Sequence, residues 1–182
     1  MRLDPSTSLL AVIDVQERLL PVIPQADRLV ARVARLAEAA RLLGVRSVVT
    51  EQYPRGLGPT DARLRPLLPP ADAKLAFSAA CSPCLEGTLG GAAAVVVCGL
   101  ETHVCIANTV LDLLARGVVV FVPVDAVAAR HAIDHDTALR RLEGAGAIPT
   151  TTEAILFEWC RTADHPAFKA VQALVKEPPA HA

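Results

Sequence analysis

The sequence predicts a single three-layer α/β domain, a Rossmann-like arrangement in which a mostly parallel central sheet lies between helices. Its 182 residues are an ordinary length for one domain, and no linker or internal repeat divides them. Hydrophobic residues, chiefly Ala, Val and Leu, make up 52% of the chain, which excludes a disordered polymer. Short, wholly apolar runs alternate with longer stretches of helical periodicity. This alternation is typical of parallel strands that helices cover on both faces.

The first third of the chain predicts two strands and the helix between them. Leu9–Ile13 is an uninterrupted apolar run that ends at Asp14, which indicates a buried strand. Val45–Thr50 is a second such run. The residues between these two strands predict a helix that ends at Gly44, the residue type expected just after a helix. Its apolar residues recur at helical spacing: Leu29, Val33, Leu36, Ala40 and Leu43. Residues 52–70 are rich in Pro and Gly and predict a long loop, a feature that is often functional.

The clearest strand–helix unit lies in the middle of the chain. Ala93–Cys98 predicts an apolar strand, which is followed by a turn through Gly99–Thr102 and a helix that runs to Arg116. Upstream, we expect a short strand at Lys74–Phe77 and a helix that starts at Ser82-Pro83, with the serine as its cap.

The last third predicts two more strands, three helices and a tail. The expected helices cover Asp134–Glu143 with Asp134 as the cap, Thr152–Trp159 and Pro166–Val175. The expected strands are Val118–Val122 and, more briefly, Ala147–Pro149, and residues 177–182 form the tail.

Composition narrows the function classes. The formal net charge of −1 argues against a nucleic-acid partner and gives no reason to expect an anionic membrane surface. Apolar runs stay well short of the roughly 20 residues that a spanning helix needs, and the first residues show no export pattern. We therefore expect a cytoplasmic protein without a membrane partner. The five cysteines do not form a secreted disulfide framework, so reduced thiols are expected.

Candidate chemistry lies where strands end, because ligands of open parallel sheets bind beyond the carboxyl ends of the strands. Cys105 lies at the start of the helix after the central strand, where backbone N–H groups and the helix dipole favour a reactive thiolate. The competing interpretation is a small buried apolar residue. Asp14 follows the first strand directly, and Lys74 begins the short strand at 74–77. Base, thiol and cation together are what nucleophilic catalysis needs.

Four segments make the chain resemble the isochorismatase-like cysteine hydrolase superfamily over about residues 8–176: LAVIDVQ at 10–16, KLAFS at 74–78, VCGLETHVC at 97–105 and DAV at 125–127. The run at 99–105 and Thr50–Pro54 resemble most closely the branch called isochorismatase domain-containing proteins.

The resemblance implies a role for each matching residue. Cys105 would be the nucleophile, Asp14 the general base and Lys74 the cation that holds their arrangement. A cis peptide bond would join Leu100 to Glu101 and turn the Glu101 N–H toward the Cys105 N–H, making an oxyanion hole. Such donors typically contribute about 3–4 kcal/mol each in the transition state.

The resemblance also implies a metal-free hydrolase that cleaves an amide or related C–N bond of a small molecule. Metal-dependent nicotinamidases use an Asp-x-His segment, whereas Thr50–Pro54 lacks one and no histidine precedes His103, so neither a metal nor another cofactor is expected. True isochorismatases lack the cysteine, so Cys105 argues against that reaction as well. A homo-oligomer, dimeric or larger, is expected. The residues expected to bind the substrate are Gln16, Gln52, Tyr53, Phe77, Leu100 and Thr102.

Several alternatives stay open. The fold could be a catalytically silent interaction module. Cys81 and Cys84 form a C-x-x-C motif, which could serve thiol–disulfide exchange or form half of a zinc site. His103 could pair with Cys105 as a dyad, while His131 and His135 are expected on a solvated face.

Overall fold

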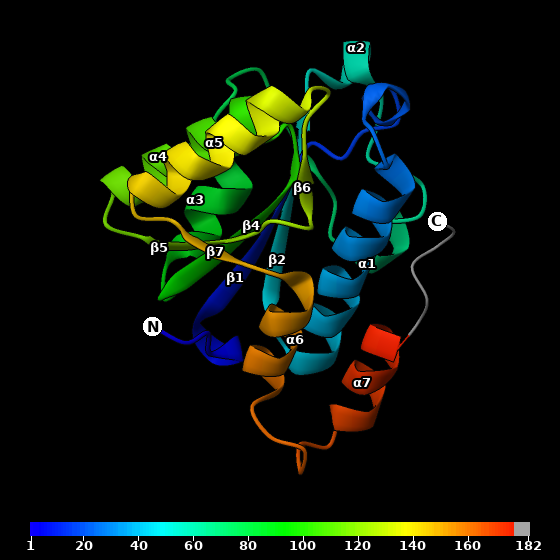
Figure 1. Ribbon diagram of the computed structural model, residues 1–182, viewed down its shortest axis with the longest axis vertical. Coiled ribbons are helices and arrows are strands. Elements are labelled where there is room, and N and C mark those ends of the chain that lie inside the picture. The colour runs from blue at the N-terminus through cyan, green and yellow to red at the C-terminus, as the bar shows by residue number, and fades with distance from the viewer. Residues whose placement is uncertain (177–182) are drawn as a thin grey trace.

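In the computed structural model, which describes residues 1–176, a central sheet lies between two groups of helices (Figure 1). Within these residues the sheet has seven strands in the order β3-β2-β1-β4-β5-β7, with β6 beside β4, and every strand pairing is parallel. The predicted three-layer α/β fold is therefore confirmed. The predicted tail at 177–182 lies outside the described residues.

The strands bring their carboxyl ends to one edge of the sheet. In the register of the two central strands and β2, Ile13 lies beside both Thr50 and Gly99. The residues that follow these positions are therefore neighbours in space, as the topology requires. The strand bounds are β1 (Ser8–Ile13), β2 (Arg46–Gln52), β3 (Asp72–Lys74), β4 (Ala94–Leu100), β5 (Val119–Pro123), β6 (Val127–Ala128) and β7 (Ile148–Thr150).

Two groups of helices cover the two faces of the sheet (Figure 1). One face carries α1 (Ala26–Leu43), α6 (Thr152–Cys160) and α7 (Phe168–Lys176). The other carries α3 (Pro83–Leu89), α4 (Ala107–Ala115) and α5 (Ala132–Gly144). The short helix α2 (Pro54–Leu57) lies in the long loop after β2. As predicted, Gly44 ends α1, with a φ of 71°.

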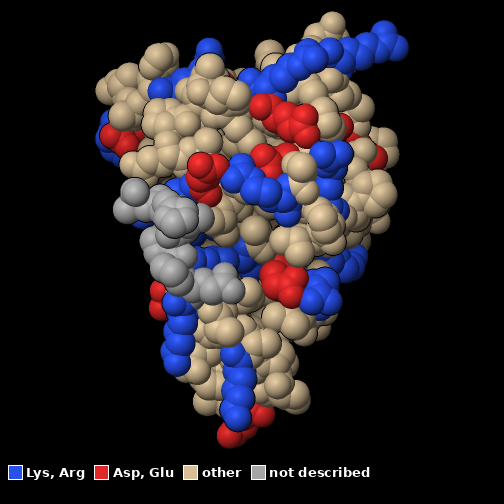
Figure 2. Space-filling model, turned by 90° about the vertical axis from the view of Figure 1, so that its right-hand side faces the viewer, with Lys and Arg blue, Asp and Glu red and all other residues tan. Residues whose placement is uncertain are grey.

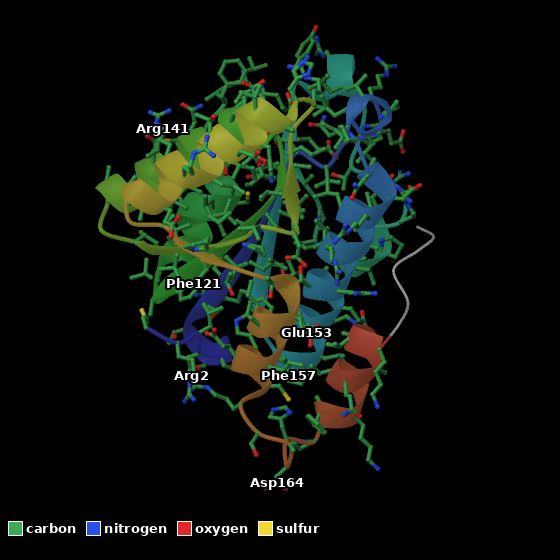
Figure 3. The ribbon with its side chains drawn as sticks, in the orientation of Figure 1. Arg2, Phe121, Arg141, Glu153, Phe157 and Asp164 are labelled. Atoms are coloured by element: carbon green, nitrogen blue, oxygen red, sulfur yellow. The ribbon has the colours of Figure 1, made fainter. Side chains whose placement is uncertain are left out.

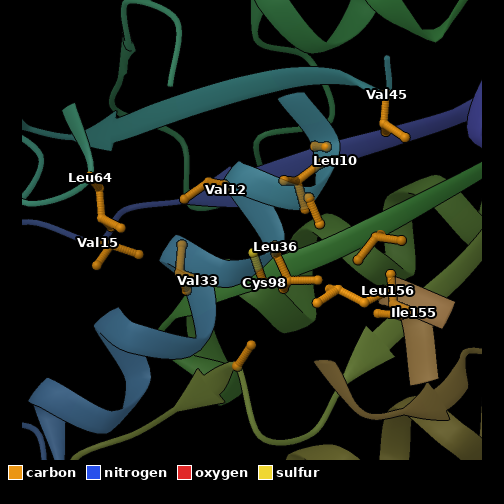
Figure 4. Close-up of a cluster of buried hydrophobic side chains, with 14 of the residues drawn as sticks. Leu10, Val12, Val15, Val33, Leu36, Val45, Leu64, Cys98, Ile155 and Leu156 are labelled. Carbon is orange, nitrogen blue, oxygen red and sulfur yellow. The ribbon is translucent and has the colours of Figure 1, made fainter. Parts of the chain in front are cut away.

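Each central strand contributes to two cores because its side chains alternate between faces. Leu10 and Val12 of β1 pack with α1 and α6 (Figure 4). Leu9, Ala11 and Ile13 of the same strand pack with α3 and α4 on the other face. Side chains thus fill the space between the layers (Figure 3).

Three element predictions need correction. The strand expected at Lys74–Phe77 is instead β3, which ends at Lys74. The chain turns after Lys74, because Lys74 Nζ donates hydrogen bonds to the carbonyl oxygens of Ala76 (3.2 Å) and Phe77 (3.1 Å). Helix α5 has His131 rather than Asp134 at its N-cap, and Asp134 lies in its first turn. The two-residue strand β6 was not predicted, because a pair of residues carries no periodicity.

The remaining predicted elements agree with the structure to within a few residues, and Ser82 stands at the N-cap of α3. Its hydroxyl, however, donates to the carbonyl oxygen of Ala79 and makes no cap hydrogen bond. Among the described helices, none is long and apolar enough to cross a membrane.

Candidate active site

Asp14 is the buried carboxylate at the end of β1. It has no exposed surface, and its φ of 54° lies in the left-handed region that Asp tolerates better than most residues. This turn ends the strand and leaves the carboxylate at the edge of the sheet. The Thr50 hydroxyl donates to Asp14 Oδ1 at 2.8 Å, and the Asp14 N–H donates to the Thr50 carbonyl at 3.1 Å. The neighbouring strand therefore fixes the orientation of the carboxylate.

Lys74 is the cation that faces this carboxylate. Its Nζ lies 2.7 Å from Asp14 Oδ2, and both side chains are buried. Gln52 Oε1 accepts a second hydrogen bond from Nζ at 2.7 Å, while Gln52 Nε2 donates to the carbonyl oxygen of Leu75. A buried ammonium needs such partners, because an unpaired charge in a protein interior is costly.

Cys105 lies in a single π-helical turn, Thr102–Ile106, between β4 and α4. It is 6% exposed. Burial, and then the nearby negative charge of Asp14, raise the pKa of the Cys105 thiol to about 12, against a smaller lowering effect of Lys74. The prediction that the helix start favours a thiolate at rest was wrong, because these two effects outweigh it. The thiol is protonated at neutral pH, with a buried carboxylate beside it that can accept its proton.

The turn that precedes Cys105 is held from outside. A cis peptide bond joins Leu100 to Glu101, as the sequence resemblance implied. Glu101 Oε1 accepts hydrogen bonds from both the backbone N–H (3.1 Å) and Nε (2.9 Å) of Arg130. The Thr102 hydroxyl lies 2.9 Å from His135 Nδ1. Arg130, which lies between β6 and α5, and His135 of α5 therefore hold the two residues at the start of the turn.

The six residues expected to bind the substrate differ in how far they are buried. Gln16, Leu100 and Thr102 are fully buried. The Gln16 amide donates to the carbonyl oxygens of Gln52 and Gly58 and accepts from the Gln52 N–H, so it ties the long loop to β2. Gln52 binds Lys74 as described. Tyr53 and Phe77 are about half exposed and border the same edge of the sheet.

Sequence reasoning assigned no role to two supporting residues. Thr50 ends the predicted strand Val45–Thr50, at the edge where candidate chemistry was expected, but its hydrogen bond to Asp14 could not be predicted. Arg130 had no signal in the sequence, since its guanidinium meets Glu101 only through the pairing of β6 with β4.

Three other motifs do not converge on Cys105. His103 Nε2 lies 3.9 Å from Asp134 Oδ2. Cys81 is exposed, and its Sγ accepts a hydrogen bond from Arg116 Nη2 at 2.9 Å. Cys84 Sγ lies 3.6 Å from the Val49 carbonyl oxygen, and burial raises the pKa of the thiol. Between residues 1 and 176, no group of three or more His, Cys, Asp or Glu side chains could hold a metal ion.

The chain is similar in sequence and in structure to known proteins of one family. Residues 8–154 match the family described as Isochorismatase domain. Isochorismatase domain-containing protein 2A of Mus musculus is 41% identical over 97% of this chain and 86% of its own length. The structure of MAR1 ribonuclease from Caenorhabditis elegans is 40% identical, with a TM-score of 0.94 over 100% of this chain and 95% of that one. YcaC from Pseudomonas aeruginosa, described with hexane-2,5-diol and covalent acrylamide, is 26% identical, with a TM-score of 0.87 over 95% and 91% of the two chains.

Proposed function

This chain belongs to the isochorismatase domain family, and from that premise we propose that it is a metal-free cysteine hydrolase that cleaves an amide or related C–N bond of a small molecule. One observation carries the proposal: the buried Asp14 carboxylate is ion-paired to Lys74 at 2.7 Å, and its charge acts on the buried thiol of Cys105. Base, cation and nucleophile thus share one edge of the sheet.

The proposed reaction proceeds through an acyl-enzyme. Asp14 takes the thiol proton as Cys105 Sγ attacks the substrate carbonyl carbon, and the oxyanion that forms is bound by the N–H groups of Glu101 and Cys105. The C–N bond then breaks, and the amine leaves with the proton from Asp14. Asp14 next takes a proton from water, whose oxygen attacks the thioester carbonyl carbon. The C–S bond then breaks, Asp14 returns that proton to the departing sulfur, and the carboxylic acid and the Cys105 thiol are released. Lys74, whose Nζ lies 2.7 Å from Asp14 Oδ2, holds the carboxylate in place throughout.

The raised pKa of Cys105 supports this use of Asp14. A thiol with a pKa of about 12 is almost wholly protonated at pH 7, so its attack has to be coupled to removal of the proton. A carboxylate held by Thr50 and Lys74 is a base in fixed orientation. The covalent acrylamide described for the Pseudomonas aeruginosa relative is consistent with a reactive nucleophile in this family.

A panel of small primary amides tests the proposal. We expect intact-mass spectrometry to detect an acyl adduct, and peptide mapping to place it on Cys105. Cys105→Ala and Asp14→Asn should each reduce turnover by at least about a hundredfold, as general-base and nucleophile losses do. Cys81→Ala, which removes an exposed thiol, is the matched control and should leave turnover unchanged. Turnover that survives both Cys105→Ala and Asp14→Asn would contradict the proposal.

RNA cleavage is a second candidate, because the Caenorhabditis elegans relative is described as a ribonuclease. The net charge of −1 favours a small substrate over a polyanion. On the face shown in Figure 2, Lys and Arg side chains are interspersed with Asp and Glu. Cleavage of a fluorescent RNA oligonucleotide that is lost in Cys105→Ala would replace the amide proposal.

The remaining alternatives also have distinct outcomes. A thiol–disulfide enzyme would show reductant-dependent activity that survives Cys105→Ser and is lost in Cys81→Ser. A silent interaction module would form no adduct on Cys105 with any amide. We expect an oligomer, dimeric or larger, which light scattering in solution would measure.

A further inference from the structure

A pocket of about 420 Å³ opens at the same edge of the sheet, and its lining includes none of Asp14, Lys74 and Cys105. Its walls come from the start of α1, the chain around β6 and the first turns of α5. Figure 1 shows these three segments at one end of the molecule. The volume falls in the range of small-molecule sites, near its lower end. The reaction proposed above makes no use of this pocket.

The lining has the composition of a ligand site. Most of it is apolar, from Leu29 on α1, Val127 and Ala128 on β6, and Ala132 on α5. Three polar side chains and one carboxylate also reach it: Gln25, Arg28, His135 and Asp125. An apolar cavity with a few placed polar groups is the usual design of a small-molecule site.

Of the charged side chains that line the pocket, only Arg28 has no partner of opposite charge among the described residues. Asp125 is already neutralised, because its Oδ2 lies 3.3 Å from Arg32 Nε and its Oδ1 accepts hydrogen bonds from the N–H and hydroxyl of Thr152. Arg28 donates only to the uncharged Gln25 Oε1, at 3.2 Å, and across residues 1–176 no carboxylate pairs with it. Both side chains are exposed and line the pocket, so the guanidinium is accessible to a ligand.

The imidazole of His135 adds a neutral polar wall. Its Nδ1 is taken up by the Thr102 hydroxyl, which leaves Nε2 as its other hydrogen-bonding atom. Burial lowers the pKa of His135, so the ring is uncharged at neutral pH. The site therefore offers one net positive charge, which suits a monoanion better than a dianionic phosphate.

We infer that this pocket binds a small carboxylate with an apolar body, whose carboxylate group meets the guanidinium of Arg28 and whose body lies against Leu29, Val127 and Ala132. Arginine presents paired N–H donors that match the two oxygens of a carboxylate. The apolar wall favours a ring or short alkyl chain, because burying that surface is favourable. The inference is independent of the hydrolase proposal, since none of the proposed catalytic residues lines the pocket.

Benzoate is the probe, with benzyl alcohol as its uncharged counterpart. We expect titration calorimetry at low salt to detect benzoate binding and to find benzyl alcohol at least about tenfold weaker, because it lacks the ionic contact. Methyl NMR shifts caused by benzoate should map to Leu29, Val127, Ala128 and Ala132, and not to Cys105 and its neighbours.

Two variants test the site itself. Arg28→Gln should weaken benzoate binding by roughly tenfold, whereas Arg41→Gln, which removes the same charge from the far end of α1, should leave it within about twofold. Ala132→Leu should also weaken binding, by filling the pocket. No benzoate binding, equal binding to Arg28→Gln, or methyl shifts confined to the surroundings of Cys105 would each overturn the inference. So would a change in subunit number in Arg28→Gln by light scattering, which would make this surface a contact between copies.

Discussion

At the scale of single residues, Asp14 has two opposing effects on Cys105. Its charge raises the pKa of the thiol, and under the proposed mechanism it also removes the thiol proton. A substitution that removes the Asp14 charge should therefore make the thiol more reactive toward an added electrophile and at the same time slow turnover.

We predict that Asp14→Asn increases the alkylation rate of Cys105 by iodoacetamide at pH 8 while it lowers amide turnover. In the native protein the pKa of about 12 keeps the thiol protonated, so the alkylation rate rises with pH up to about pH 12. Without the Asp14 charge, burial alone opposes the lowering effect of Lys74 on the thiol pKa, and the whole alkylation profile moves to lower pH. Peptide mass spectrometry measures the rate at Cys105 alone.

Asp112→Asn is the matched control, because Asp112 is an exposed carboxylate on α4. It should leave the alkylation profile of Cys105 in place. An Asp14→Asn profile that coincides with the native one, or lies at higher pH, would show that the Asp14 charge does not govern the thiol.

The candidate site could be predicted from the sequence only at its reactive positions. Asp14 and Cys105 follow buried strands, so topology alone brings them to one edge of the sheet. The state of the thiol could not be predicted, since it depends on burial and on the distance to Asp14. Nor could the pairing of Gln52 with Lys74, because a side-chain hydrogen bond across two strands leaves no mark in periodicity.

At the scale of elements, the close approach of β4 to β1 depends on Gly99. Its φ is +120°, a conformation that side chains rarely adopt, and a Cβ there would lie 2.0 Å from the Ile13 carbonyl oxygen. The residue stands immediately before Leu100 and the cis peptide. Glycine therefore lets the end of the central strand lie directly against the end of β1, where the proposed site is built.

We predict that Gly99→Ala lowers the free energy of unfolding by more than about 3 kcal/mol, because a backbone atom cannot yield to the new methyl group. Urea unfolding followed by circular dichroism measures this. Gly117→Ala provides the comparison: its φ of +76° is also left-handed, but nothing lies within 4 Å of its Cβ position. It should cost only about 1–2 kcal/mol, the cost of the conformation itself. Equal losses in the two variants would rule out the steric argument.

At the scale of the whole molecule, the fold could be predicted because buried parallel strands leave a strong signal. Runs such as Leu9–Ile13 and Ala93–Cys98 have no polar face, which only a sheet covered on both sides can accommodate. The misplaced strand at 74–77 shows where this signal stops. Leu75 and Phe77 are apolar yet 76% and 57% exposed, because the carbonyl groups of the loop bind the Lys74 ammonium instead of continuing the ladder.

The same strands join the two cores into one cooperative unit. Val96 and Cys98 of β4 belong to the core under α1 and α6, while Val95 and Val97 of the same strand belong to the core under α3 and α4. Neither core can be exposed without removing the support of the other. We therefore predict a single unfolding transition in urea, with one midpoint for both faces.

Three probes distinguish the faces in one experiment. Trp159, the sole tryptophan, lies fully buried in the core under α1 and α6, and Cys160 lies beside it in the same core. Cys105 reports on the opposite core. Tryptophan fluorescence and pulsed thiol labelling of Cys160 and Cys105 should give coincident midpoints. If Cys105 became accessible at a urea concentration where Trp159 and Cys160 stayed protected, the helices over the proposed site would form a separate unit of stability, and the shared strands would not couple the two layers.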